Sequence, residues 1–287
     1  MHGSDDLARE NQRLQREALL LRARLDAVES SRWWRLHPRL GLRRMLEGKD
    51  AVVDKDVAEG THALPIDFDE ADAELCQRVA PYTMTTPARI YALARAVEYV
   101  VSRPVSGALV ECGVWRGGSM MAIALTLLRL GVRDRDLYLF DTFEGMTEPG
   151  KEDVKHTGER AADILASSSR DSHDWAVASL GEVRAAVLGV GYPEEKIHFV
   201  RGPVEETLPM NAPADIALLR LDTDWHSSTK HALGHLYPGL RPSGVLLIDD
   251  YAYWKGARQA VDEYMRENDV QLLLNRIDYS ARIAVKP

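Results

Sequence analysis

The sequence predicts an α/β fold built on one large, mostly parallel β-sheet with a short antiparallel hairpin at its end. From about residue 80 onward, short apolar segments of strand character alternate with segments of helical character, the pattern of a doubly wound domain. Helical segments such as 119–130 and 228–240 separate the first five strands, whereas four residues separate the last two. The predicted strands are Ala108–Gly113, Leu137–Thr142, Ile197–Gly202, Ile216–Asp222, Val245–Asp249, Leu272–Ile277 and Arg282–Val285.

The first 47 residues form a separate N-terminal region, followed by a main domain over 48–287. Residues 4–29 have apolar side chains at alternating spacings of four and three, with Ser4 as a candidate cap and Asn11 within the apolar seam. This pattern predicts an amphipathic helix that forms a parallel coiled coil, and therefore a homo-oligomer of at least two chains. A helix that lies on its own domain is the alternative.

Five arginines and two tryptophans lie within residues 32–44 of an otherwise acidic protein. This basic stretch is a candidate surface for docking to a membrane or a partner protein, and a linker helix covering the main domain is an equal alternative. A second irregular stretch, residues 144–175, is polar and too long for a plain connection. We interpret it as a lid or a substrate loop.

Composition excludes several classes of protein. The formal net charge is −8, which argues against nucleic acid as a partner, because neutralising phosphates requires a basic face. No apolar run reaches the roughly 18 residues of a membrane span, so we expect a cytoplasmic protein. The two cysteines, Cys76 and Cys112, form neither a disulfide framework nor a zinc-binding spacing.

A glycine-rich turn after the first predicted strand has the character of a cofactor loop. It runs from Glu111 to Ser119 and leads into an apolar helix, at the edge of an α/β sheet where ligands bind. Its glycine spacing is not that of a dinucleotide site, and the Glu111 carboxylate would repel a pyrophosphate, so the loop favours S-adenosylmethionine over NAD. Asp141, at the end of the second strand, is placed to accept the ribose hydroxyls of an adenosine.

Acidic residues end two further strands. Asp222 and Asp224 follow the fourth strand, and Asp249 and Asp250 follow the fifth. If these strands are neighbours, the four carboxylates converge near the cofactor loop and repel one another unless a cation joins them. Oxygen ligands without cysteine or clustered histidine favour Mg²⁺ over Zn²⁺. Acidic strand ends that are solvated or paired with Arg or Lys are the alternative.

Five blocks in this order resemble the macrocin O-methyltransferase (TylF-type) family of S-adenosylmethionine- and Mg²⁺-dependent sugar O-methyltransferases. The resemblance spans about residues 81–287 and implies the Rossmann-like class I methyltransferase fold. The blocks are Tyr82-Thr83-Met84-Thr85, Glu111 to Ser119, Asp141 to Met146, Leu221 to Asp224 with Ser227-Ser228-Thr229, and Asp249-Asp250-Tyr251.

The resemblance implies a role for each matched residue. Thr83 and Met84 would contact the methionine part of the cofactor, Asp141 its ribose, and Ser179 the adenine side. The remaining cofactor-binding residues would be Glu111, Gly113, Trp115, Arg116, Ser119 and Phe143. The implied metal ligands are Asp222, Asp249 and Asp250, with Asp224 as the general base. The family commonly has a tyrosine near Trp225 and His226, and this departure bears on acceptor recognition.

This assignment agrees with the chemistry of a sugar hydroxyl, whose high pKa requires both a cation and a base to form an alkoxide. We therefore expect a sugar or glycoside acceptor. One alternative is a catechol-type O-methyltransferase, which typically uses a lysine base, and the nearest lysine here is Lys230. Another is a non-catalytic assembly protein. Tyr251, Tyr253 and Trp254 either stack on a sugar face or pack as ordinary aromatic residues.

Overall fold

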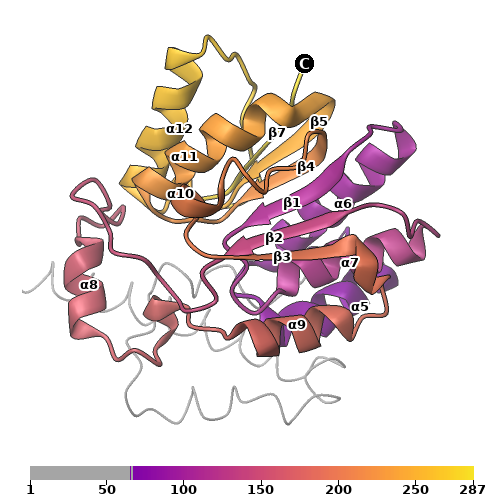
Figure 1. Cartoon of the computed structure of the whole chain (residues 1–287), viewed down its shortest axis with the longest axis horizontal. Coiled ribbons are helices and arrows are strands. Elements are labelled where there is room, and N and C mark those ends of the chain that lie inside the picture. The colour runs from indigo at the N-terminus through magenta and orange to yellow at the C-terminus, as the bar shows by residue number, and fades with distance from the viewer. Residues whose placement is uncertain (1–64, 66) are drawn as a thin grey trace, which may run out of the picture. The chain divides into compact units, whose positions relative to one another are not determined.

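Five parallel strands and an antiparallel hairpin form one sheet in the computed structural model, which describes residue 65 and residues 67–287. The strand order is β3-β2-β1-β4-β5-β7-β6 (Figure 1). β5 pairs parallel with β4 and antiparallel with β7, which pairs antiparallel with β6. The predicted sheet and its terminal hairpin are confirmed. The strands are β1 Ala108–Cys112, β2 Leu137–Asp141, β3 Ile197–Arg201, β4 Ile216–Leu221, β5 Leu240–Ile248, β6 Asn275–Arg276 and β7 Arg282–Val285.

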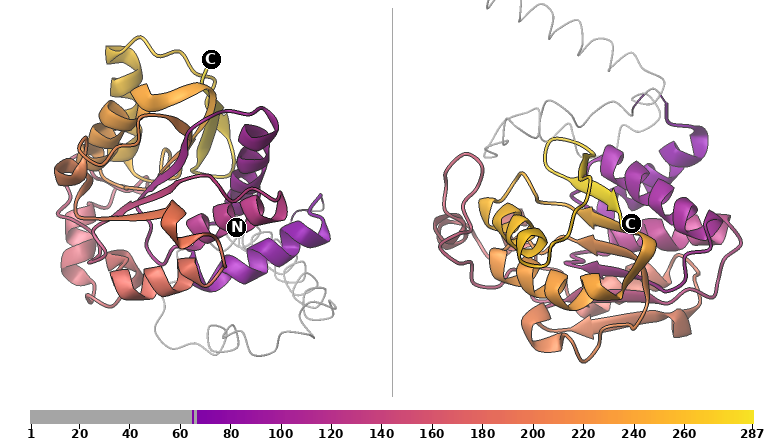
Figure 2. Two further views of the ribbon diagram at one scale, coloured as in Figure 1. Left: turned by 45° about the vertical axis from the view of Figure 1, so that its right-hand side comes forward. Right: turned by 90° about the horizontal axis from the view of Figure 1, so that it is seen from above.

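Helices cover both faces of this sheet (Figures 1 and 2). One apolar cluster joins α5, α6, α7 and α9 to one face, and a second joins α10, α11 and α12 to the other. The α-helices are α5 Glu70–Val79, α6 Pro87–Ser102, α7 Gly118–Arg129, α8 Ala161–Ser167, α9 Leu180–Leu188, α10 Val204–Thr207, α11 His226–Leu236 and α12 Lys255–Glu267. The short 3-10 helices are Ala80–Tyr82, His173–Trp175, Glu194–Lys196 and Tyr237–Gly239.

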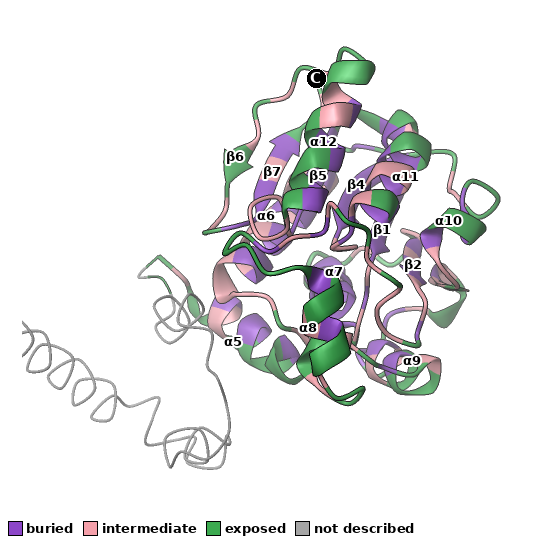
Figure 3. Ribbon diagram, turned by 90° about the vertical axis from the view of Figure 1, so that its left-hand side faces the viewer, coloured by how far each residue is buried: buried purple, intermediate pink, exposed green. Residues whose placement is uncertain are grey.

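The strands are apolar on both sides because helices cover both sides. Leu109 of β1 faces the cluster with α6 and α7, whereas its neighbour Val110 faces the cluster with α11 and α12. Figure 3 shows buried residues along the strands and exposed residues on the outer surfaces of the helices. This arrangement brings the carboxyl ends of β1, β2, β4 and β5 to the same edge.

Local sequence signals set several helix boundaries. Asp69 caps α5 in a capping box with Asp72, and Thr86 caps α6 with Pro87 in its first turn. The helix predicted over 228–240 instead spans His226–Leu236, since Pro238 interrupts the helical hydrogen bonds. The chain then enters β5 at Leu240, five residues before the predicted start of that strand.

The last predicted strands differ in length from those in the structure. The expected strand over 272–277 is reduced to Asn275–Arg276, because Leu272 and Leu274 pack against the apolar cluster under α12 rather than extending the ladder. Segment 144–175 contains α8 and a 3-10 helix. In the part of the chain that the structure describes, no helix has the length and apolarity needed to cross a membrane. The helix predicted over 4–29, the arginine-rich stretch over 32–44 and the boundary at residue 47 lie outside the described residues.

Candidate active site

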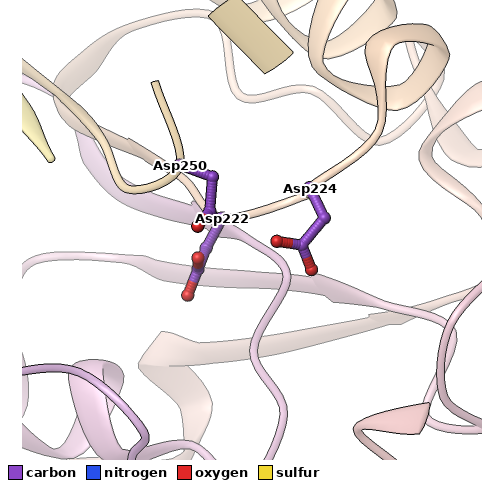
Figure 4. A group of neighbouring side chains, drawn as sticks. All are labelled: Asp222, Asp224 and Asp250. Atoms are coloured by element: carbon purple, nitrogen blue, oxygen red, sulfur yellow. The ribbon is translucent and has the colours of Figure 1, made fainter. Parts of the chain in front are cut away.

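A group of carboxylates lies where β4 and β5 end. Leu221 and Ile248 are paired at the ends of these neighbouring strands, so the residues that follow them meet at the same edge. Asp222, Asp224 and Asp250 each offer an oxygen, and these oxygens lie within 4.8 Å of one another (Figure 4). The sequence prediction that acids from the two strands converge is therefore confirmed for these three.

Asp249 lies differently from its expected place. One oxygen of its carboxylate is 2.7 Å from Nη2 of Arg220, and the other is bonded to Arg89. The side chain is buried between these two guanidinium groups. Asp249 is thus absent from the group of three oxygens, in which Asp224, expected as the base, takes its place.

The two arginines organise a buried network of charges below the carboxylate group. Arg220 is bonded to Glu111 of β1 and lies 2.9 Å from the carboxylate of Asp222. Arg89 of α6 donates to Asp278 at 2.8 Å. These arginines were not identified from the sequence, although a charged residue inside the apolar run of β4 signals that a buried partner is required.

Glu111 is held inside the protein rather than presented to a ligand. Its side chain is fully buried, and one oxygen accepts from Arg220 while the other has no hydrogen-bond partner among the described residues. Burial raises the pKa of Glu111 to about 8, against the opposing effect of the Arg220 charge. The side chain therefore connects β1 to β4 beneath the cofactor loop.

The electrostatics of the carboxylate group suit a cation. Burial and the charge of Asp222 raise the pKa of Asp224 to about 7, although a hydrogen bond with Asp250 opposes this rise. Burial and neighbouring carboxylates also raise the pKa values of Asp222 and Asp250. One oxygen of Asp250 is buried without a hydrogen-bond partner in the described part of the chain. A hard divalent cation would neutralise these closely spaced carboxylates and bind the oxygen that lacks a partner. The residues therefore fit Mg²⁺.

Asp141 ties the cofactor loop to the end of β2. Its Oδ2 accepts from the backbone nitrogens of Val114 at 2.6 Å and Trp115 at 3.1 Å, and its Oδ1 accepts from Phe143 at 2.7 Å. Trp115 and Phe143 both have positive φ angles, of 48° and 53°. The carboxylate therefore supports two strained turns, one at Trp115 and one at Phe143.

Glycines let the loop pack closely against its neighbours. Gly113 has a φ of +84°, and a Cβ there would lie 2.0 Å from the carbonyl oxygen of Asp222. A Cβ on Gly118 would lie 2.6 Å from the Cβ of Thr83, so the segment before α6 lies against the start of α7. The cofactor loop thus lies beside both the carboxylate group and the residues expected to hold methionine.

Three of the other predicted residues lie in or beside this loop, and the fourth, Ser179, lies at the start of α9. Ser119 is buried in the first turn of α7, and the guanidinium of exposed Arg116 lies 4.9 Å from the Trp115 ring centre. Met84 is 53% exposed, which leaves its side chain open to a ligand. Ser179 caps α9 in a capping box with Glu182, a structural role that the sequence analysis did not assign to it.

Three features define a class I S-adenosylmethionine-dependent methyltransferase: the sheet order, the glycine-rich loop after β1, and the acidic residues at the carboxyl ends of β2, β4 and β5. Residues 50–284 match the macrocin O-methyltransferase (TylF) family. The chain belongs to this family and is an O-methyltransferase, as the sequence resemblance predicted.

Characterised relatives cover most of the chain. It is 34% identical over 202 residues to demethyldecarbamoylnovobiocin O-methyltransferase of Streptomyces niveus, which covers 69% of this chain and 72% of the relative. It is 34% identical over 213 residues to the 8-demethyl-8-(2,3-dimethoxy-alpha-L-rhamnosyl)-tetracenomycin-C 4'-O-methyltransferase of Streptomyces olivaceus, covering 73% and 78% of the two chains. The solved structure of the O-methyltransferase NovP is similar with a TM-score of 0.64 and 31% identity, over 71% of this chain and 82% of that one.

Proposed function

We propose that this enzyme transfers a methyl group from S-adenosylmethionine to a sugar hydroxyl of a glycoside, a natural-product sugar or a saccharide. The observation that carries the proposal is the group of Asp222, Asp224 and Asp250 beside the cofactor loop. The names of two relatives support the sugar acceptor: the rhamnosyl-tetracenomycin-C 4'-O-methyltransferase, and the mycinamicin III 3''-O-methyltransferase of Micromonospora griseorubida, which is 30% identical over 197 residues. An alcohol acceptor requires a base and a cation, and the carboxylate group suits both.

The proposed cofactor site surrounds the glycine-rich loop. S-Adenosylmethionine supplies an electrophilic methyl group on a sulfonium. Thr83 and Met84 would hold its methionine part, Asp141 its ribose and Ser179 its adenine side. The remaining proposed cofactor residues are Glu111, Gly113, Trp115, Arg116, Ser119 and Phe143. Glu111 would act from below by fixing the loop, because its side chain is buried against Arg220.

The proposed metal ligands are Asp222, Asp249 and Asp250, and the proposed base is Asp224. Each carboxylate oxygen has two lone pairs, so Asp249 can keep its bonds to Arg89 and Arg220 and still offer one to a cation. When bound, Mg²⁺ supplies positive charge that makes a nearby hydroxyl more acidic. Asp224 would take the proton of that hydroxyl, because its carboxylate oxygen lies within 4.8 Å of those of Asp222 and Asp250.

The position of Lys230 does not favour a catechol-type reaction, in which a lysine typically serves as the base. Its ammonium lies 2.8 Å from a carboxylate oxygen of Glu263 and 3.2 Å from one of Glu267, both on α12. These contacts direct the lysine toward α12 and give it two acidic partners. The acidic group at the strand ends is therefore the better source of a base, which favours an alcohol acceptor.

The proposal is tested by release of S-adenosylhomocysteine in the presence of single acceptors. Methyl glycosides of rhamnose, fucose and glucose would be compared with catechol and caffeate. We expect turnover with at least one glycoside, none with the phenols, and loss of turnover in Asp250→Asn but not in the control Asp163→Asn, which changes an exposed side chain of α8. Turnover confined to the phenols would overturn the sugar assignment.

The N-terminal region carries a separate proposal, based on sequence alone. We propose that the apolar seam over 4–29 associates two or more chains, and that residues 32–44 dock to a membrane surface or a partner protein. Light scattering should give at least the mass of a dimer for the full chain. The double variant Leu14→Asp with Leu21→Asp should give the mass of a monomer, and an unchanged mass would contradict the coiled coil.

A further inference from the structure

Segment 146–165 packs against the residues that follow the proposed base. Trp225, directly after Asp224, is 2% exposed and lies in an apolar cluster with Ala161 and Leu165 of α8. Its indole nitrogen donates to the carbonyl oxygen of Thr147 at 3.1 Å. The Trp254 ring meets the Trp225 ring edge to face, with centres 5.0 Å apart. The residue after Asp224 is thus held by the segment that was interpreted as a lid.

Asp153 of the same segment binds the next residue along. The carboxylate is 1% exposed, and its Oδ1 accepts from the backbone nitrogen of His226 at 2.8 Å. Its Oδ2 accepts from the backbone nitrogen of Gly150 at 2.7 Å. A Cβ on Gly256 would lie 2.0 Å from Oδ1, so this carboxylate also fills the space beside the first turn of α12. Asp153 therefore lies between the starts of α11 and α12.

The backbone at Asp224 needs such support. Its φ angle is +61°, in the left-handed region that a non-glycine residue adopts at a cost in free energy. The backbone nitrogen of Trp225 donates back to the carbonyl oxygen of Thr223 at 2.7 Å, which closes a tight turn around Asp224. A strained turn persists when the surrounding structure fixes it, and residues 225 and 226 are fixed by Thr147 and Asp153.

We propose that Asp153 is a positioning residue for methyl transfer, which holds the Asp224 carboxylate at the reaction site by binding the start of α11. This inference rests on the proposed role of Asp224 as the base. Segment 146–165 then forms one fixed side of the active site, and its packing against α11 determines the position of the Asp224 carboxylate. Loss of the Asp153 carboxylate leaves the backbone nitrogen of His226 without its acceptor and lets the turn at Asp224 relax, while the cofactor loop after β1 keeps its own contacts.

Hydrogen–deuterium exchange tests the structural part without an acceptor. In Asp153→Ala, we expect faster exchange of the amides of residues 224–228 and unchanged exchange in β1 and β2. The matched control is Asp163→Ala, which removes an exposed carboxylate of the same segment that pairs with Arg160. Unchanged exchange at residues 224–228 in Asp153→Ala would overturn the proposal.

A double-mutant cycle tests whether Asp153 acts through Asp224. With the fastest acceptor of the glycoside panel, Asp153→Ala should lower kcat at least about tenfold and leave the Kd for S-adenosylmethionine unchanged. In an Asp224→Asn background, the same change should have almost no further effect on the residual rate. An equal loss in both backgrounds would show that Asp153 acts independently of Asp224. Full activity of Asp224→Asn would instead contradict the proposed base.

Two further variants keep the test decisive if Asp153→Ala does not fold. Asp153→Asn retains an oxygen that can accept from His226 and should recover most of the lost rate. Trp225→Phe retains the buried ring but removes the bond to Thr147, and should lower kcat without weakening cofactor binding. Full activity in Trp225→Phe and a complete loss in Asp153→Asn would together exclude positioning through this turn.

Discussion

The guanidinium of Arg220 lies 2.7 Å from the carboxylate of Asp249 and also contacts Glu111 and Asp222, so one buried cation joins acids from three neighbouring strands. Glu111 belongs to the cofactor loop region and Asp222 and Asp249 to the carboxylate edge. The position of the cofactor loop relative to the carboxylate group therefore depends on this arginine. Buried ion networks of this kind are costly to break, because the remaining charges lose their partner.

Arg220→Met should lower the free energy of unfolding by about 3–5 kcal/mol, since it leaves buried carboxylates without their cation. Urea denaturation followed by circular dichroism measures this loss. The control is Arg241→Met, which removes a half-exposed arginine 3.3 Å from Asp215 and should cost at most about 1 kcal/mol. Equal losses in the two variants would show that burial of the Arg220 network is unimportant.

Gly113 and Gly191 form a matched pair for testing the close approach of the cofactor loop. Their φ angles are +84° and +83°, but a Cβ on Gly113 meets the Asp222 carbonyl oxygen while one on Gly191 meets nothing within 4 Å. Gly191→Ala should cost about 1–2 kcal/mol for its backbone conformation alone. Gly113→Ala should cost clearly more and weaken S-adenosylmethionine binding, measured by urea denaturation and calorimetry. Similar stabilities would contradict the tight packing against Asp222.

Asp224→Asn and Asp249→Asn should affect different properties. If Asp224 is the base, Asp224→Asn should lower turnover about 100-fold or more and change Mn²⁺ affinity little. If Asp249 is a metal ligand, Asp249→Asn should weaken Mn²⁺ binding about tenfold or more. Titration with Mn²⁺ and turnover assays on both variants decide the roles. If Asp224→Asn instead weakens Mn²⁺ binding and Asp249→Asn does not, the third ligand is Asp224, whose oxygen lies with those of Asp222 and Asp250 in the structure.

Ser179→Ala tests the cap of α9. Loss of the hydroxyl that accepts from the backbone nitrogen of Glu182 should cost about 1 kcal/mol of stability. Ser167→Ala, at the exposed end of α8, is the control and should change stability by less than about 0.5 kcal/mol. Calorimetry with S-adenosylmethionine on the same proteins tests the proposed adenine contact separately, through a weaker Kd for Ser179→Ala.

The sequence predicts the sheet well because apolar strands and intervening helices have distinct periodicities. Six of the seven predicted strands overlap strands of the structure by four or more residues; the exception is the segment over 272–277, where packing of Leu272 and Leu274 under α12 overrides strand propensity. Cys112, which ends β1, is completely buried in the apolar cluster on the α11 side of the sheet. Strand ends are also visible in the sequence, which is why the convergence of acids was predictable.

The partners of these acids were not predictable, because they come from distant parts of the chain. Arg89 lies 160 residues before Asp249, and Asp153 lies 73 residues before His226. Tyr253 and Trp254 were candidates to stack on a sugar, and in the structure the Trp254 ring packs on Trp225. The guanidinium groups of Arg258 and Arg282 lie 5.4 and 5.0 Å from the centre of the Tyr251 ring. Such contacts depend on tertiary packing that no local pattern encodes.

The proposed cation-assisted methyl transfer is tested most directly by turnover of the fastest glycoside before and after removal of divalent cations. We propose that the acids at the ends of β4 and β5 act with a bound cation during methyl transfer to a sugar hydroxyl. S-Adenosylhomocysteine release should be abolished by EDTA and restored by excess Mg²⁺, with S-adenosylmethionine still bound throughout. Undiminished release after complete removal of metal would contradict a role for the cation.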